Sequence, residues 1–265
     1  MKVKTRLILG GVVSFVALIV VSLVALSIEK ATMLEDRKIK TQHLVESVHG
    51  VVTHFYDLQK SGVMSEEQAQ TAALQAIKSL RYDTKEYFWV NDQTQPIPKM
   101  LMHPTVPALE GKVLDAANFN SATGLQFGNN STWVKTDGKK NIFVAFNEVV
   151  NKSGQGFVTY NWSKPKAGGG STDELFAKLS FVKKFDAWNW TVGSGIYIDD
   201  VDTIFWERAS QFSMIVLLAM VIIGVVIRWQ VRSITQPLDS LRALVTEVEM
   251  TSDFSRRIKN ITEDE

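Results

Sequence analysis

The chain has 265 residues, 29 basic and 28 acidic side chains, and a formal net charge of +1. This balance shows neither the basic excess of a nucleic-acid-binding domain nor the charge imbalance of a disordered tail. The chain has no cysteine, so no disulfide stabilises any domain that lies outside the cytoplasm. The distribution of apolar residues is more informative than these totals.

Two long apolar runs predict two membrane-spanning helices, at residues 7–28 and 209–227. Each is close to the roughly 20 residues that cross a bilayer core as a helix. A cleaved signal peptide is the alternative for the first run, because Lys2, Lys4 and Arg6 precede it. The run exceeds the roughly 7–15 apolar residues of a signal peptide, however, and no clear cleavage site follows it. The uncleaved anchor is therefore favoured.

Basic residues near the two runs predict the orientation of the chain. Lys and Arg favour the cytoplasmic side of a span, and they flank residues 7–28 on the N-terminal side and residues 209–227 on the C-terminal side. Residues 1–6 and 228–265 are then cytoplasmic. Residues 29–208 form a periplasmic domain, which is long enough to build its own core.

The first part of this domain is predicted to be helical. Apolar residues recur at helical spacing from Leu44 to Leu58, in continuation of the first span. After a break, Ser65 and Gln68 form a capping-box pattern, which predicts a second helix through Leu80.

Strands are predicted in the remainder. Residues 86–91 alternate, with Tyr87 and Trp89 on one face, and residues 99–103 form an antiparallel return strand. Residues 104–138 show loop signals without a clear period, and residues 141–150 form a short helix. Further strands begin at Gly156, Phe176 and Trp190. This order of elements predicts an α+β fold with an antiparallel sheet.

Beyond the second run, apolar residues repeat at heptad spacing from Ile234 to Val248, and Pro237 lies near the start of the predicted helix. This pattern indicates a short coiled-coil seam. The chain then ends within a charged segment, and we expect a larger cytoplasmic portion to follow.

Several short segments together resemble a known family. They are "YFWVND", "MLMHP", "LEGK", "GQGFVTYNWSKP" and "KLSFVKKFDAWNWTVGSGIYIDD", all between the two runs. In this order they resemble the single-Cache (type 2) sensor domains of bacterial methyl-accepting chemotaxis receptors and of sensor kinases. "SITQPLDSLRALV", with Asp253 and the terminal "DE", resembles the start of a HAMP linker. The region of residues 115–140 departs from the family pattern, because no short Asp-x-x-Gly turn is evident there.

The resemblance implies a PAS-like Cache domain in which a long N-terminal helix packs on an antiparallel sheet, flanked by two transmembrane helices. It implies a homodimer in the bacterial inner membrane, with a periplasmic ligand pocket and a cytoplasmic complex of kinase and adaptor as partner. Ligand closure is expected to shift the last strand, and residues 198–207 would pass that shift to the second span.

No catalytic motif supports an enzyme. Nucleophile elbow, P-loop, HExxH and dinucleotide patterns are absent from the sequence. His43, His49 and His54 share the long helix, but their spacing lacks the i, i+3 or i, i+4 pair of a helical metal site. The small residues of Gly193–Gly195 indicate a closely packed strand. We therefore expect no cofactor, no metal and no nucleic acid partner.

A set of aromatic and polar residues predicts a binding pocket. Its members are Tyr87, Trp89, His103, Tyr160, Trp162, Phe181 and Lys183. Tyr160, His103 and Lys183 are the expected donors, while Trp89 and Phe181 are expected to form walls. Such a combination suits a short monocarboxylate such as pyruvate, acetate, propionate or lactate. The alternative, without the resemblance, is that these aromatics are ordinary sheet core.

Three other functions remain open. The same sensor could serve a histidine kinase or a cyclic-dinucleotide enzyme. The chain could also be a membrane-anchored periplasmic enzyme, or an anchored periplasmic protein without a ligand.

Overall fold

The computed structural model describes residues 3–83, 86–129, 131–166 and 170–251. They fall into two compact units, one within Ala31–Ile204 and one within Met1–Lys30 and Phe205–Glu265. The first unit contains the sheet. The second contains the two apolar runs.

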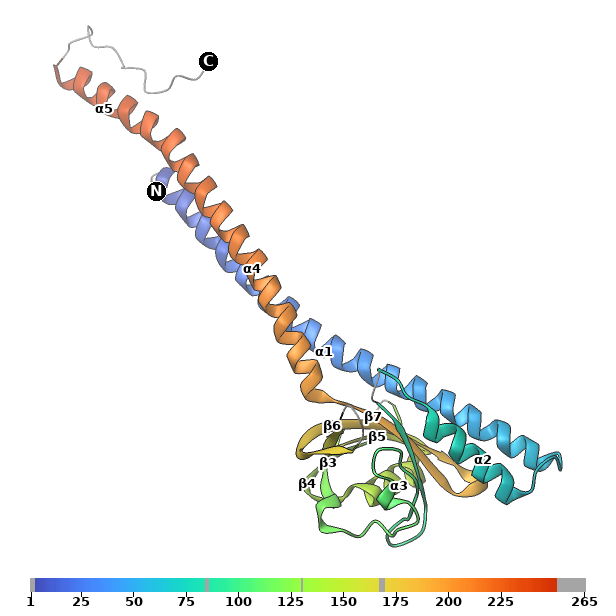
Figure 1. The fold of residues 1–265 in the computed structure, drawn as a ribbon. Coiled ribbons are helices and arrows are strands. Elements are labelled where there is room, and N and C mark those ends of the chain that lie inside the picture. Colours follow the sequence, from blue (N-terminus) through green and yellow to red (C-terminus); the bar gives the residue numbers. More distant parts are fainter. Residues whose placement is uncertain (1–2, 84–85, 130, 167–169, 252–265) are drawn as a thin grey trace. The chain divides into compact units, whose positions relative to one another are not determined.

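A single antiparallel sheet of seven strands, in the order β2-β1-β7-β6-β5-β3-β4, forms the centre of the Ala31–Ile204 unit (Figure 1). The strands are β1 Phe88–Asp92, β2 Met100–Met102, β3 Asn120–Phe127, β4 Val134–Asn141, β5 Gln155–Pro165, β6 Ser171–Phe185 and β7 Trp190–Tyr197. The predicted α+β fold with an antiparallel sheet is confirmed.

The helices are α1 Val3–Lys60, α2 Glu66–Ser79, α3 Ile142–Ser153, α4 Ile198–Gln230 and α5 Gln236–Thr251. Short 3₁₀ turns occur at Pro107–Leu109, Ala117–Phe119 and Asp186–Trp188, and a π-helical turn occurs at Val231–Thr235. The predicted capping box is present, because the Ser65 hydroxyl accepts from the Gln68 amide and the Gln68 side chain accepts from the Ser65 amide. Asn141 caps α3, and Gly154 ends it with a φ of 73°.

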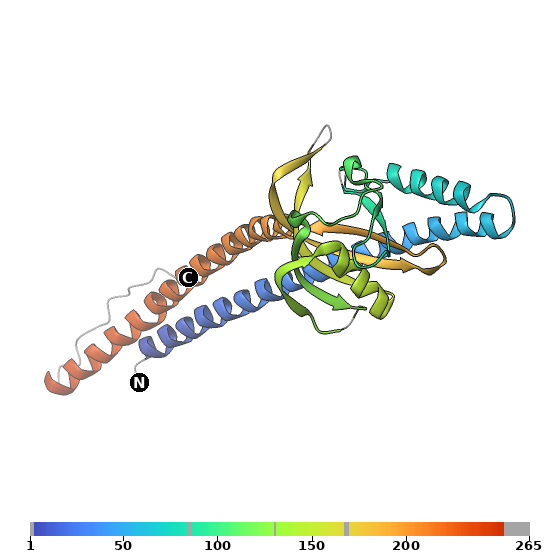
Figure 2. The ribbon, with the colours of Figure 1, turned by 90° about the horizontal axis from the view of Figure 1, so that it is seen from below.

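Each face of the sheet is covered by its own apolar core (Figures 1 and 2). One core joins Val48 and Val52 of α1 and Ile77 of α2 to the sheet, and the other joins Phe143 and Phe146 of α3 to it. The predicted alternation of β1 is confirmed, because Phe88 and Val90 belong to the first core and Tyr87 and Trp89 to the second. A sheet covered on both faces gives long apolar strands instead of clean polar alternation.

The structure corrects the prediction of a loop over residues 104–138, because β3 and β4 occupy much of that region. Strand β4 is an edge strand with the sequence "VKTDGKKN", and most of its residues are exposed or half-buried. Lysine-rich, exposed edge strands lack apolar alternation, and their backbone pairing alone defines them. Strands β5 and β6 also begin earlier than predicted, at Gln155 and Ser171.

Two helical stretches, Thr5–Lys60 and Ile198–Glu247, are long and apolar enough to cross a membrane, and the unit that holds the apolar runs contains part of each. Their most apolar 18-residue windows have mean hydropathies of 2.9 and 2.5, and the predicted spans at residues 7–28 and 209–227 lie within these helical stretches. Within this unit, Arg208 pairs with Glu29 at 3.1 Å. The helix predicted near Pro237 is present as α5, whereas Asp253 and the terminal "DE" lie outside the described residues.

Candidate functional site

A buried polar cluster lies on the α3 face of the sheet. At its centre is Lys178 of β6, whose cross-strand partners are Tyr160 of β5 and Tyr197 of β7. Directly paired residues of neighbouring strands point to the same face, so these three side chains project together. Tyr87, directly before β1, reaches the cluster from one strand further along the sheet.

The ammonium group of Lys178 is fully buried. Its Nζ lies 3.3 Å from the hydroxyl of Tyr87, 4.4 Å from the centroid of the Tyr87 ring and 4.7 Å from that of the Tyr197 ring. Among the residues that the structure describes, no carboxylate forms an ion pair with Lys178. Burying an ammonium without an anion is costly, because only ring faces and one hydroxyl replace its water. A small anion would compensate this charge.

His103 contributes a neutral imidazole. Its backbone N–H donates to Glu110 Oε1 at 3.1 Å, and its Nδ1 accepts from the Val106 N–H at 3.1 Å. Burial, with the nearby charge of Lys178 as the next cause, lowers the pKa of His103 to about 3. Since Nδ1 is an acceptor and the ring is neutral near pH 7, Nε2 carries the proton and is a potential donor.

Tyr160 supplies a hydroxyl in the same cluster. Its Oη lies 2.8 Å from the Ser180 Oγ, and the side chain is 4% exposed. Burial raises the pKa of the Tyr160 phenol above its usual value. The phenol thus stays protonated at physiological pH and can donate a hydrogen bond.

Aromatic rings enclose these polar groups. The ring centroid of Trp162 lies 6.0 Å from that of His103, and the ring stacks on Phe119 at 5.9 Å. Trp89 packs on Phe146 at 5.1 Å. The Trp89 ring also lies over Gly193 of β7, where an added Cβ would be 2.3 Å from the indole. A glycine is needed at this position for the ring to approach the backbone.

Five of the seven predicted site residues come together on this face, namely Tyr87, Trp89, His103, Tyr160 and Trp162. The structure does not bring Phe181 and Lys183 to them. Phe181 belongs to the core on the α1 face, and Lys183 Nζ lies 4.0 Å from Glu46 of α1. Both residues therefore lie on the face opposite the cluster.

Sequence reasoning missed Lys178, although strand alternation contains the signal. Residues 178, 180 and 182 of β6 point away from residues 179, 181 and 183, so a site on the α3 face must draw on the first set. The missing information was which face carries the polar cluster.

The remaining predicted features lie elsewhere. His43, His49 and His54 are on α1, and His49 Nε2 lies 3.1 Å from the Lys184 carbonyl. Within the described residues, no group of three or more His, Asp or Glu side chains could hold a metal ion. The Asp92 carboxylate accepts from the Lys99 amide at 2.7 Å in the turn after β1.

The sequence profile of the Cache domain family matches residues 20–209. The methyl-accepting chemotaxis protein McpP of Pseudomonas putida is 33% identical over 269 residues, which cover 100% of this chain and 44% of McpP. The sensor histidine kinase MctS of Rhizobium johnstonii is 28% identical over 170 residues, which cover 64% of this chain and 30% of MctS. The chain thus spans less than half the length of these curated relatives.

Solved structures give the same assignment. One, described as the structural basis for carboxylic acid recognition by a Cache chemosensory domain, is 33% identical with a TM-score of 0.50, over 63% of this chain and 97% of that chain. A periplasmic sensor domain of a chemotaxis protein is 38% identical with a TM-score of 0.50, over 63% of this chain and 98% of that chain. With the profile match over residues 20–209, these likenesses confirm the predicted resemblance to Cache sensor domains, and the chain belongs to the Cache domain family.

Proposed function

We propose that this chain is the sensory part of a bacterial transmembrane chemoreceptor that binds a short monocarboxylate, such as pyruvate, acetate, propionate or lactate, in the periplasm. Residues 7–28 and 209–227 cross the inner membrane, and residues 29–208 form the periplasmic sensor. Residues 1–6 are cytoplasmic, and residues 228–265 are the start of a HAMP linker. The chain acts without catalysis and without a cofactor.

The observation that carries this proposal is the buried ammonium of Lys178, which has no carboxylate partner among the described residues. One cation matches one carboxylate. The hydroxyls of Tyr87 and Tyr160 and the Nε2–H of His103 are neutral donors that can complete its hydrogen bonds. Trp89 and Trp162 provide apolar surface for a short carbon chain, which is the usual division of roles in small-ligand sites.

This ligand set differs from the sequence-based one at two positions. Lys178 takes the role of the charged donor, and Phe181 and Lys183 are left out because they lie on the α1 face. The carboxylic acid recognition stated for a similar Cache domain supports the ligand class. The likeness to a chemotaxis protein supports the receptor role.

The partners follow from this function. We propose a homodimer embedded in the lipid bilayer, which signals to a cytoplasmic complex of kinase and adaptor and makes no contact with nucleic acid. A second candidate is the sensor of a histidine kinase, which the likeness to MctS supports. The two candidates share the same ligand site and differ in the output domain that follows it in the full-length gene.

Calorimetry on the purified chain in lipid nanodiscs tests the ligand class. Short monocarboxylates should bind and raise the melting temperature, because a ligand that binds only the folded state stabilises it by mass action. Amino acids, dicarboxylates and sugars serve as the comparison panel. Absence of binding by every monocarboxylate, or tighter binding of a compound without a carboxylate, overturns the proposal.

A further inference from the structure

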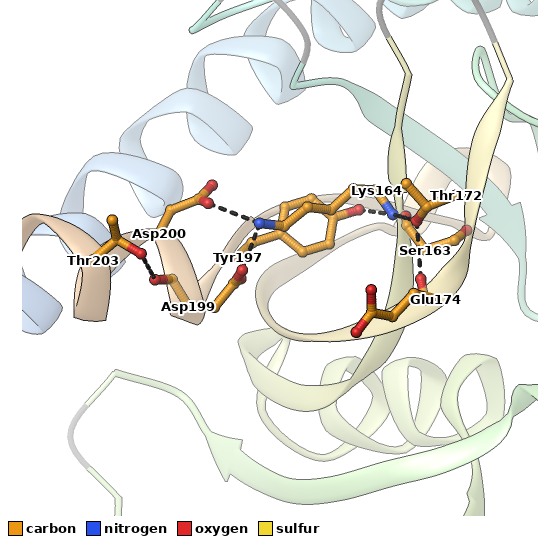
Figure 3. Close-up of polar contacts among 8 residues, drawn as sticks. All are labelled: Ser163, Lys164, Thr172, Glu174, Tyr197, Asp199, Asp200 and Thr203. Atoms are coloured by element: carbon orange, nitrogen blue, oxygen red, sulfur yellow. Dashed lines mark hydrogen bonds and ion pairs between the residues drawn. The ribbon is translucent and has the colours of Figure 1, made fainter.

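Tyr197 connects the candidate anion site to the helix that leads to the second apolar run. It is the last residue of β7, and α4 begins at the next position, Ile198. Its ring centroid lies 4.7 Å from Lys178 Nζ. Its hydroxyl donates to the Ser163 carbonyl of β5 at 2.6 Å (Figure 3). A change at Lys178 thus reaches Tyr197 by direct contact.

A second lysine lies beside the same ring. Lys164 Nζ donates to Asp199 Oδ2 at 2.6 Å and to Asp200 Oδ1 at 2.7 Å, and both acids are in the first turn of α4 (Figure 3). The same Nζ lies 5.2 Å from the centroid of the Tyr197 ring. Lys164 therefore ties strand β5 to the start of α4.

The hairpin end of β5 and β6 supports Lys164. The backbone N–H of Lys164 donates to the Thr172 hydroxyl at 2.9 Å, and that hydroxyl donates to the Glu174 carbonyl at 2.9 Å (Figure 3). The Lys164 side chain is 16% exposed, and its Nζ lies 4.5 Å from the centroid of the Phe176 ring. These contacts fix the Lys164 backbone and place its ammonium over the Phe176 ring.

The pairing is stronger than an ordinary surface ion pair. Burial acts to lower the pKa of Lys164, but the hydrogen bonds to Asp199 and Asp200 outweigh it and raise the pKa. Partial burial limits the screening that weakens exposed pairs. Two acids in the first turn also interact favourably with the positive end of the helix dipole.

We propose that Lys164 is a latch on the first turn of α4, and that an acid bound at Lys178 tightens it through Tyr197. This inference rests on the proposed function for its ligand. Without a bound acid, Lys178 and Lys164 are two cations beside one ring, with Nζ atoms 4.7 and 5.2 Å from the Tyr197 centroid, and like charges repel each other. A bound carboxylate neutralises Lys178, relieves that repulsion and strengthens the hold of Lys164 on Asp199 and Asp200.

Hydrogen exchange of the chain in lipid nanodiscs, read on peptides within residues 198–204, tests the latch. In the wild type, saturating propionate should slow exchange in this segment. Lys164→Met should exchange faster in the empty state and lose the slowing, and its propionate affinity should fall by the factor by which propionate strengthens the latch, because coupling between two sites is reciprocal. The double variant Asp199→Asn with Asp200→Asn should behave like Lys164→Met.

Lys140→Met is the matched control, because it removes an ion pair with Glu148 between β4 and α3. It should leave exchange in residues 198–204 unchanged. Melting temperatures and circular dichroism identify any variant that fails to fold, and the paired acid variants then provide the test. A wild type that binds propionate without slowing, or a Lys164→Met variant that still slows, overturns the latch.

The experiments distinguish a failure of the proposed function from a failure of the latch. If calorimetry shows no propionate binding to the wild type, the proposed function fails. The empty-state comparison still decides whether Lys164 holds α4, since faster exchange in Lys164→Met but not in Lys140→Met supports the hold. Equal exchange in the two variants refutes it.

Discussion

Lys178 Nζ lies 3.3 Å from the hydroxyl of Tyr87 and 4.4 Å from the centroid of its ring, and both side chains are almost completely buried. The ring face and the hydroxyl are weak substitutes for the water that an ammonium loses on burial. A buried charge held only by these groups lowers the stability of the fold, and in the proposed function it is the group that binds the carboxylate.

Lys178→Met tests both consequences. The variant should lose at least about tenfold in monocarboxylate affinity, or about 1.4 kcal/mol of binding free energy. Its melting temperature without ligand should equal or exceed that of the wild type, because an apolar side chain of similar length removes an uncompensated buried charge. Calorimetry and thermal melts of the chain measure the two effects.

Lys183→Met is the matched control, since Lys183 is on the same strand but faces Glu46 of α1. Its affinity should remain unchanged. A loss of binding in Lys183→Met with full binding in Lys178→Met would reverse the assignment and restore the donor that was predicted from the sequence.

Tyr160→Phe separates ligand contact from stability. The variant loses the hydroxyl that lies 2.8 Å from Ser180 Oγ, which should cost about 1 kcal/mol of unfolding free energy and also weaken acid binding. Tyr82→Phe is the control, because the Tyr82 hydroxyl lies 2.7 Å from Ser194 Oγ and the ring packs on the α1 core. Tyr82→Phe should lose similar stability and keep its affinity. Equal losses of affinity in both variants would show that Tyr160 acts only through the fold.

The sequence predicts which residues of a strand share a face, but it does not predict which face carries the site. Alternation placed Tyr87 and Trp89 together, and the structure confirms it. In β6 the alternating residues are apolar on both faces, such as Phe181 on one face and Val182 on the other, because both faces of the sheet are covered. Periodicity alone cannot rank two buried faces.

Lys178 was also hidden by its residue type. A lysine in a strand is normally read as exposed, since lysine is rarely fully buried. Only the pairing with Tyr160 and Tyr197 shows that its side chain enters the aromatic cluster. Strands β3 and β4 escaped prediction for a related reason, because their partly polar sequences follow backbone pairing and not apolar alternation.

Gly193→Ala tests the close approach of Trp89 to β7. The added Cβ would lie 2.3 Å from the indole, so the ring must shift and disturb its contacts with Phe146 and Asn91. Overpacking of this kind costs roughly 1–3 kcal/mol of unfolding free energy, and we expect acid affinity to fall with it. Thermal melts and calorimetry provide the measurements.

Gly50→Ala is the control, and it should change the unfolding free energy in the opposite direction. Gly50 is an exposed position of α1 with no atom within 4 Å of an added Cβ. Alanine should stabilise the helix by roughly 0.5–1 kcal/mol. Destabilisation by both substitutions would contradict the packing argument for Gly193.

His103 predicts a pH dependence of stability. Burial, with the charge of Lys178 as the next cause, lowers the pKa of this imidazole from 6.5 to about 3 in the folded chain. As the pH falls below about 6.5, the unfolded chain takes up a proton that the folded chain does not, so the unfolded state gains stability. The contribution of His103 is therefore fully favourable above pH 6.5 and is lost progressively as the pH falls toward 3.

Denaturant unfolding of wild type and His103→Gln at pH 7 and pH 5 measures this contribution. Between these pH values the wild type should lose roughly 2 kcal/mol more unfolding free energy than the variant, because each unit of pKa difference corresponds to about 1.4 kcal/mol. His54→Gln, at an exposed position of α1, should keep the wild-type slope. Since the carboxylates that also titrate in this window are common to all three proteins, the difference between slopes belongs to the replaced histidine. Parallel slopes for wild type and His103→Gln would mean that His103 is charged in the folded chain, which would remove the neutral Nε2 donor from the proposed site.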